Sequence, residues 1–195
     1  MTKSVEFFFD FTSPTAYLAF TQLPKLAAAA KAEIIWRPFF LGGVMQATGN
    51  RPPGTVAAKG AHMSVDMQRF ARRYGVPLGS NPHFPMKTLP ALRAATGLLG
   101  DRDFLPFVSA MFQASWVDGV DVGNPDVIAQ ISTQAGLDPA RIEALATASE
   151  NKEKLKATTD EAVARGAFGA PTFFVGNDMF FGQDRLDFVA EALAA

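Results

Sequence analysis

The chain has 195 residues, of which 48% are hydrophobic, and its formal net charge is −1. It holds no cysteine and only two histidines, His62 and His83, which excludes disulfides and thiolate metal sites, and we expect no metal to be bound. There is no block of lysine or arginine and no apolar run of about 18 residues, so we expect no nucleic-acid or membrane partner. Because the absence of cysteine fits a cytosolic protein, we expect a cytoplasmic location.

The first 40 residues show the pattern of a strand, a helix and a second strand. Val5–Phe11 is short, aromatic and apolar, as a buried strand is. Pro14–Ala30 has an apolar side and an alanine run, which predict a helix with Pro24 inside it. Glu33–Phe39 reads as the second strand, so the segment forms a βαβ unit.

The middle of the chain is predicted to be helical after a connector. Leu41–Pro53 is rich in glycine and proline, which indicates a loop. Stripes of methionine and aromatic residues then recur at helical spacing, which is typical of core packing rather than of a cofactor site. The predicted helices cover Met63–Tyr74, closed by Gly75, and Leu89–Leu99, Phe104–Trp116, Asp126–Ala135, Pro139–Ala148 and Lys152–Arg165.

The last 30 residues return to strands. Thr172–Val175 and Met179–Phe181 flank a Gly-Asn-Asp turn, which predicts a hairpin. A final helix from Arg185 to Ala194 follows, with Asp184 as its candidate cap. This order predicts an α/β protein of the thioredoxin-like class: residues 1–40 and 166–195 form the thioredoxin-like domain, and residues 41–165 form an all-helical insertion.

Ser13 stands where redox proteins of the thioredoxin class carry a cysteine, between the first strand and the first helix. Ser13 followed by Pro14 is also an ordinary helix N-cap with proline at the first helical position. In a thioredoxin fold, Pro171 at the start of a later strand is cis and faces Ser13, which leaves the Ala170 backbone free for a ligand. The absence of a protein thiol argues against the competing class of thiol–disulfide oxidoreductases, and the sulfur would come from a bound small molecule such as glutathione.

The chain resembles the family of 2-hydroxychromene-2-carboxylate isomerases and kappa-class glutathione transferases, which share a DsbA-like thioredoxin fold. The likeness covers essentially the whole chain, and its specificity comes from several motifs in one order. These motifs are Phe9-Asp10-Phe11-Thr12-Ser13-Pro14, Gly49-Asn50-Arg51-Pro52-Pro53-Gly54, Lys59-Gly60, Gly166-Ala167-Phe168-Gly169-Ala170-Pro171-Thr172 and Phe181-Gly182-Gln183-Asp184-Arg185.

The resemblance implies a glutathione site and a homodimer. Ser13 would be the catalytic residue, donating a hydrogen bond to the glutathione sulfur and favouring its thiolate. Ala170 would pair with the cysteinyl backbone of the tripeptide, and the other residues would hold its two ends or the mouth of the site. The implied glutathione-binding residues are Ser13, Asn50, Lys59, Ala170, Pro171, Gln183 and Asp184.

The resemblance implies an isomerase in which the glutathione thiolate adds to a conjugated carbon, the double bond rotates, and glutathione leaves. The second substrate would be a small hydrophobic or aromatic electrophile. Leu41–Gln46 holds no basic residue, whereas the isomerases place a lysine near Met45, and the Gly49–Gly54 pattern with Lys59 looks more like the kappa class. A kappa-class transferase or peroxidase, and a non-catalytic glutathione-binding protein, therefore remain open as alternatives.

Overall fold

The computed structural model describes residues 3–195, so the first two residues of the predicted thioredoxin-like segment lie outside the described part. A mixed sheet of four strands has the order β2-β1-β3-β4. The strands are β1 (Ser4–Phe9), β2 (Glu33–Pro38), β3 (Thr172–Val175) and β4 (Asp178–Phe181). β1 is parallel to β2 and antiparallel to β3, and β3 and β4 form the predicted hairpin.

Helices and the loops that join them make up the rest of the described chain. The thioredoxin-like elements carry α1 (Pro14–Ala30) and α9 (Leu186–Ala194), and the residues between β2 and β3 supply the others. Those intervening helices are α2 (Leu41–Thr48), α3 (Ala57–Tyr74), α4 (Leu89–Gly97), α5 (Phe104–Gln113), α6 (Pro125–Gln134), α7 (Pro139–Thr147) and α8 (Ser149–Ala164). Within residues 3–195 no helix is both long and apolar enough to cross a membrane.

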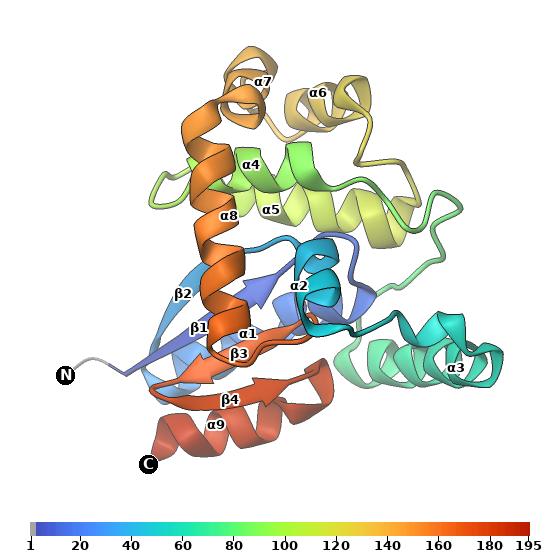
Figure 1. Cartoon of the computed structure of the whole chain (residues 1–195), viewed down its shortest axis with the longest axis vertical. Helices are drawn as coiled ribbons and strands as arrows, with labels where there is room; N and C mark the ends of the chain where they lie inside the picture. The colour runs from blue at the N-terminus through green and yellow to red at the C-terminus, as the bar shows by residue number, and fades with distance from the viewer. Residues whose placement is uncertain (1–2) are drawn as a thin grey trace.

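The helices cover the sheet on both faces. Figure 1 shows α8 and α2 crossing in front of the strands and α1 behind them, with α9 along the lower edge and in contact with α1 and β3. α4 to α7 form a further layer above the sheet, while α3 extends to one side. The thioredoxin-like fold predicted from the order of elements is thus confirmed.

The core is built from phenylalanines that alternate along β1. Phe7 and Phe9 point to one face, where Phe7 stacks on Phe173 of β3 at 5.3 Å between ring centroids. Phe8 points to the other face and packs against Phe39 and Phe174. Because all the phenylalanines of β1 are fully buried, the strand that ends next to Ser13 is held on both sides.

The aromatic stripe predicted for the helical segment is also in the core. Phe107, Met111 and Phe112 of α5 are fully buried, and Phe112 packs against Phe11, just before Ser13. The helix ends in a π-helical turn, Ala114–Asp118, which places Trp116 so that its Nε1 donates to the Phe11 carbonyl oxygen at 2.8 Å. The helical layer therefore fixes the loop that carries Ser13.

The connector predicted over Leu41–Pro53 is wrong in its first half, which is α2. Two glycines near the start lower helix propensity, but tertiary contacts override it: Leu41 and Val44 are buried against the sheet. The glycines serve a close approach, since a Cβ on Gly42 would lie 2.6 Å from the Phe40 ring. The chain is irregular only after Gly49, which ends α2 at φ +71°.

Asp184 was predicted to cap the last helix, and this is wrong. It lies in a 3₁₀ turn, η3 (Gln183–Arg185), and α9 begins at Leu186 with no side-chain cap. The Asp184 carboxylate instead accepts from the guanidinium of Arg185 at 2.8 Å. By contrast, the predicted closure of α3 at Gly75, which has φ +66°, is confirmed.

Candidate functional site

Ser13 lies at the N-terminus of α1, where its hydroxyl makes three contacts. Its Oγ accepts from the Ala16 N–H at 3.1 Å, as an N-cap does, and donates to the Ala170 carbonyl oxygen at 3.1 Å. It also lies 2.9 Å from the Thr15 hydroxyl. The structure thus joins two segments that are 157 residues apart in the chain.

The Ala170–Pro171 peptide bond is cis, as predicted from the fold, and it faces the start of α1. The Ala170 carbonyl oxygen accepts from the hydroxyls of both Ser13 and Thr15. Within residues 3–195 the Ala170 N–H donates to no acceptor. Among the described residues, the Ala170 N–H thus remains available to a ligand, whereas the Ala170 carbonyl oxygen already accepts two hydrogen bonds.

Thr15 is a residue of this site that the sequence reasoning did not single out. Its Oγ1 donates to the Ala170 oxygen at 3.0 Å, close to the Ser13 hydroxyl. Its own N–H, in the first turn of α1, has no acceptor among the described residues. A hydroxyl two residues after a helix cap is common, and only the approach of Ala170 gives it a role.

Asp10 anchors the loop that presents Ser13. Its Oδ1 accepts from the Thr12 N–H at 3.0 Å and from the Thr88 hydroxyl at 2.7 Å. Its Oδ2 accepts from the Leu41 N–H, the first of α2, at 2.9 Å. The Asp10 carbonyl oxygen accepts from the Ser13 N–H at 3.0 Å. One carboxyl group thus ties the Ser13 loop to the starts of α2 and α4.

Burial raises the pKa of the Asp10 carboxyl, and the hydrogen bonds from Thr12, Thr88 and Leu41 oppose that rise without cancelling it. The group is fully buried, so it does not reach a ligand. Its contribution to the site is positional: it fixes where β1 ends and where α1 begins.

Gln183 and Asp184 lie beside the start of β3. The Gly182 N–H donates to the Pro171 carbonyl oxygen at 3.0 Å, which brings η3 next to the cis-proline. Gly182 has φ +100°, a conformation that glycine adopts readily. The Tyr74 hydroxyl of α3 donates to the Gln183 carbonyl oxygen at 2.9 Å, so α3 supports this turn from outside. Burial is the main cause that raises the Tyr74 pKa.

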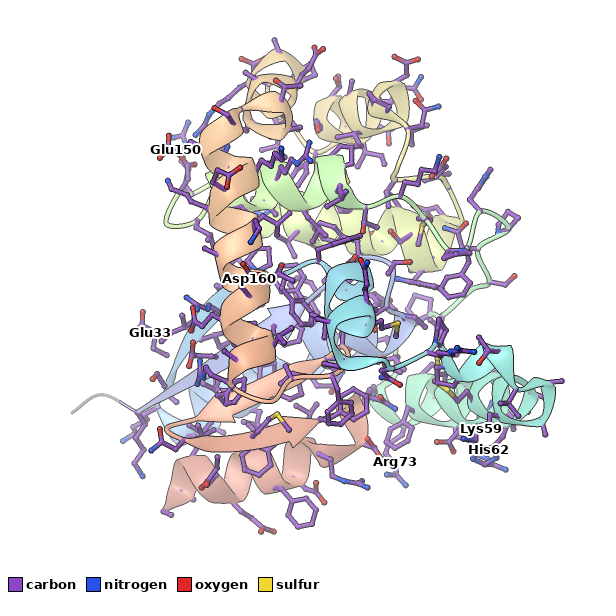
Figure 2. The ribbon with its side chains drawn as sticks, viewed as in Figure 1. Glu33, Lys59, His62, Arg73, Glu150 and Asp160 are labelled. Carbon is purple, nitrogen blue, oxygen red and sulfur yellow. The ribbon has the colours of Figure 1, made fainter. Side chains whose placement is uncertain are left out.

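A hollow of about 530 Å³ opens between α1, α3 and α9 next to this turn. Gln183 and Asp184 line it together with charged residues of both signs, among them Lys25, Arg73 and Asp187. Figure 2 shows Arg73 at the end of α3 that approaches α9. Such a mixture suits a ligand end that carries both an ammonium and a carboxylate.

The two remaining predicted residues, Asn50 and Lys59, lie just before α3 and on its first turns. The Asn50 Nδ2 donates to the Phe168 carbonyl oxygen at 2.7 Å, which places Asn50 against the segment that leads to Ala170. Lys59 is exposed on the first turns of α3 and has no ion-pair partner among the described residues. Figure 2 shows Lys59 and His62 on the part of α3 that lies away from the sheet.

The arrangement can bind an anion and an extended peptide together. A helix N-terminus with a free N–H and two hydroxyls favours a negative atom beside Ser13. The free Ala170 N–H can pair with a peptide that runs past the cis-proline. The amide and carboxylate groups of η3 line the hollow, and Lys59 of α3 has no ion-pair partner among residues 3–195.

Comparison with known proteins gives a consistent result. The chain matches the DsbA-like thioredoxin domain family over residues 4–194. It is 35% identical to a 2-hydroxychromene-2-carboxylate isomerase of Sphingobium xenophagum, over 99% of both chains. It is 28% identical to human glutathione S-transferase kappa 1, over 99% of this chain and 92% of the relative. A solved structure of 2-hydroxychromene-2-carboxylate isomerase superposes with a TM-score of 0.85 at 29% identity, covering 97% of this chain and 94% of that one.

Proposed function

The chain belongs to the DsbA-like thioredoxin family, among enzymes named 2-hydroxychromene-2-carboxylate isomerase and glutathione S-transferase kappa, and from that premise we propose that it is a glutathione-dependent isomerase. Its substrate would be a hydroxychromene carboxylate or the ring-opened benzylidenepyruvate. The observation that carries the proposal is the Ser13 hydroxyl, 3.1 Å from the Ala170 carbonyl oxygen at a helix N-terminus, in a chain without a thiol.

The residues fit the thiol of glutathione. A free thiol has a pKa of about 8.5, so only a few per cent is ionised near neutral pH. Lowering that pKa by about two units requires roughly 2.7 kcal/mol of stabilisation of the anion. The Ser13 hydroxyl and the free Thr15 N–H at the N-terminus of α1 are two donors that can supply it.

Thr15 makes the Ser13 proton available. Ser13 donates to the Ala170 oxygen in this structure, and that bond must be released before Ser13 donates to a sulfur. The Thr15 hydroxyl already donates to the same oxygen at 3.0 Å, so the buried carbonyl stays satisfied when Ser13 turns away. We assign Thr15 a positioning role for this reason.

The protein otherwise binds and orients. When bound, glutathione supplies the thiolate that adds to the conjugated double bond and leaves again, so that the bond can rotate. Ala170 fixes the tripeptide through its free N–H, beside the cis-proline Pro171. Gln183 and Asp184 hold the γ-glutamyl end in the hollow at η3, while Asn50 and Lys59 hold the glycyl end or close the mouth of the site.

A kappa-class transferase acting on another electrophile is the second candidate. The observation that favours it lies in α2, which contains no basic residue to bind the carboxylate of a chromene substrate beside the sulfur. A non-catalytic glutathione-binding protein is a third possibility that the turnover assay below addresses. A cytoplasmic homodimer belongs to the same proposal, and analytical ultracentrifugation tests the dimer.

Calorimetry with reduced glutathione tests binding. We expect saturable binding in the wild type and in Ser13→Ala, because most contacts come from the backbone and from the two ends of the tripeptide. Asp184→Asn is expected to weaken binding, while Asp178→Asn, which removes an exposed carboxylate at the start of β4, leaves it unchanged. Absence of binding at millimolar glutathione would overturn the proposal.

Turnover then separates the candidates. The account predicts isomerisation of 2-hydroxychromene-2-carboxylate that requires catalytic glutathione and is lost in Ser13→Ala. Conjugation of 1-chloro-2,4-dinitrobenzene without isomerisation would favour the kappa-class reading instead. Binding without either reaction would leave a non-catalytic glutathione-binding protein and refute the enzymatic proposal.

A further inference from the structure

A second cavity lies between α2, α4 and α8, and the residues of the candidate site do not line it. Its volume is about 500 Å³, within the range of about 300–1,000 Å³ typical of small-molecule sites. Most of its wall is apolar and comes from all three helices, with Phe40 and Ala47 on the α2 side, Leu89 on α4 and Leu155 on α8. Figure 1 shows α2 and α8 in front of the sheet and α4 in the layer above it.

Hydrogen bonds join Phe40 to α8 at the floor of the cavity. The Phe40 N–H donates to the Thr159 hydroxyl at 2.9 Å, and that hydroxyl donates to the Leu155 carbonyl oxygen at 2.7 Å. A Cβ added to Gly43 would lie 3.4 Å from the Thr159 methyl group, so α2 and α8 approach each other closely here. Backbone and side-chain polar groups of the floor are thus satisfied internally, and it offers an apolar surface.

The charged groups on the wall are unbalanced. Three cations line the cavity, Arg93 of α4 and Lys152 and Lys156 of α8, against the single carboxylate of Asp160. Lys156 is ion-paired with Asp160, four residues further along α8. Figure 2 shows Asp160 midway along that helix. Neither Arg93 nor Lys152 has an ion-pair partner in the part of the chain that the structure describes.

The side chain of Arg93 also lacks a hydrogen bond that its burial calls for. Its Nε is buried and has no hydrogen-bond partner among residues 3–195. The other arginine with a buried Nε that lacks a hydrogen bond, Arg37, has ion pairs with Glu6 and Glu161, so its charge is compensated. A buried guanidinium nitrogen without an acceptor is unfavourable, and a planar guanidinium matches a carboxylate.

We propose that this cavity is a binding site for an amphipathic carboxylate, whose anionic group pairs with Arg93 and Lys152 and whose hydrocarbon or aromatic body lies against Phe40, Leu89 and Leu155. The choice of a carboxylate rests on the two uncompensated cations beside an apolar wall. The site shares no lining residue with the glutathione site proposed above, and it does not depend on that proposal.

Isothermal titration with octanoate and 2-naphthoate tests the site, with 1-octanol as the neutral comparison. We expect saturable binding of at least one carboxylate with a stoichiometry of one per chain, and binding of the alcohol weaker by about tenfold or more. The two carboxylates distinguish an aliphatic from an aromatic occupant. No saturable binding of either one at millimolar concentration overturns the proposal.

Variants locate the binding. Arg93→Gln is expected to lower the affinity for the carboxylate about ten- to a hundredfold. Lys152→Gln is expected to lower it a few fold. Lys154→Gln is the matched control, because Lys154 lies on the same helix, is exposed and pairs with Glu150. Ala47→Phe fills the cavity from the exposed side of α2 and is expected to abolish binding with an unchanged melting temperature.

Three results contradict this site. Equal affinity in Arg93→Gln and Lys154→Gln would mean that Arg93 does not bind the ligand, and unchanged binding in Ala47→Phe would place the ligand elsewhere. Competition with glutathione would place it in the catalytic site. Retained octanoate binding in Ser13→Ala, with additive heats when glutathione is present, is the outcome expected of a separate site.

Discussion

Asp10 offers a test of how the Ser13 loop is held. Asp10→Asn keeps an oxygen that can accept from Thr12 and Thr88. Its amide NH₂ group, however, would face the Leu41 N–H, which in the wild type donates to the carboxylate at 2.9 Å. One hydrogen bond is lost and two donors face each other in a buried place. We expect a loss of unfolding free energy of about 1–3 kcal/mol near neutral pH.

The pH dependence gives a sharper test of the same carboxyl group. Burial raises its pKa in the folded protein above the ordinary value of 3.8, so the folded state retains the proton more readily than the unfolded chain does. Stability therefore falls as pH rises from about 3.8 through the folded pKa, because the unfolded state releases its proton first. The stability advantage of the wild type over Asp10→Asn is expected to shrink across that window.

Urea unfolding at a series of pH values measures both effects. Asp178→Asn is the control, since it removes one exposed carboxylate from the same sheet. If the advantage of the wild type instead grows as pH rises, the three hydrogen bonds outweigh desolvation and the argument on Asp10 is refuted. If Asp10→Asn is as stable as the control at every pH, Asp10 does not anchor the loop.

Three further predictions concern the site and its support. Thr15→Val is expected to bind glutathione but to lower the isomerisation rate at neutral pH, with recovery at higher pH, because Ser13 then stays on the Ala170 oxygen; an unchanged pH–rate profile would refute this role. Gly182→Ala is expected to lower the free energy of unfolding in urea by about 1–3 kcal/mol and to lower the affinity for glutathione in calorimetry, because the φ of Gly182 is +100° and an added Cβ would lie 2.4 Å from an Asp184 oxygen. An affinity equal to that of the wild type would show that η3 does not bind the tripeptide. Phe7→Ala is expected to cost about 3–5 kcal/mol because its buried ring stacks on Phe173, whereas Phe188→Ala, at an exposed ring, is expected to stay within about 0.5 kcal/mol in the same assay.

Most of the fold was predictable because its signals are local. The apolar run of β1, the hairpin of β3 and β4, and the stripe on α5 each follow from periodicity, and the structure confirms them. α2 was not predictable in this way. Two glycines mark its first turn as a poor helix, and only its packing against the sheet and the Asp10 side chain makes it one.

The part of the site that the sequence did not predict consists of contacts between segments far apart in the chain. The sequence placed Ser13 and Pro171 together through the expected fold, and the structure shows the two segments in contact. The roles of Thr15 and Asp10 were not predictable, because their partners Ala170 and Thr88 lie 155 and 78 residues away in the chain. The roles of Asn50, Lys59, Gln183 and Asp184 toward glutathione stay predictions, although the first is tied to the segment before Ala170.

The central claim is that Ser13 stabilises the thiolate of bound glutathione. Ultraviolet difference titration of the thiolate absorbance, with glutathione saturating the wild type and Ser13→Ala, measures the thiol pKa in each complex. The account predicts a pKa about one to two units below the free value of about 8.5 in the wild type, and a value close to the free one in Ser13→Ala. The same pKa in both proteins would show that Ser13 is only the cap of α1 and would contradict the account.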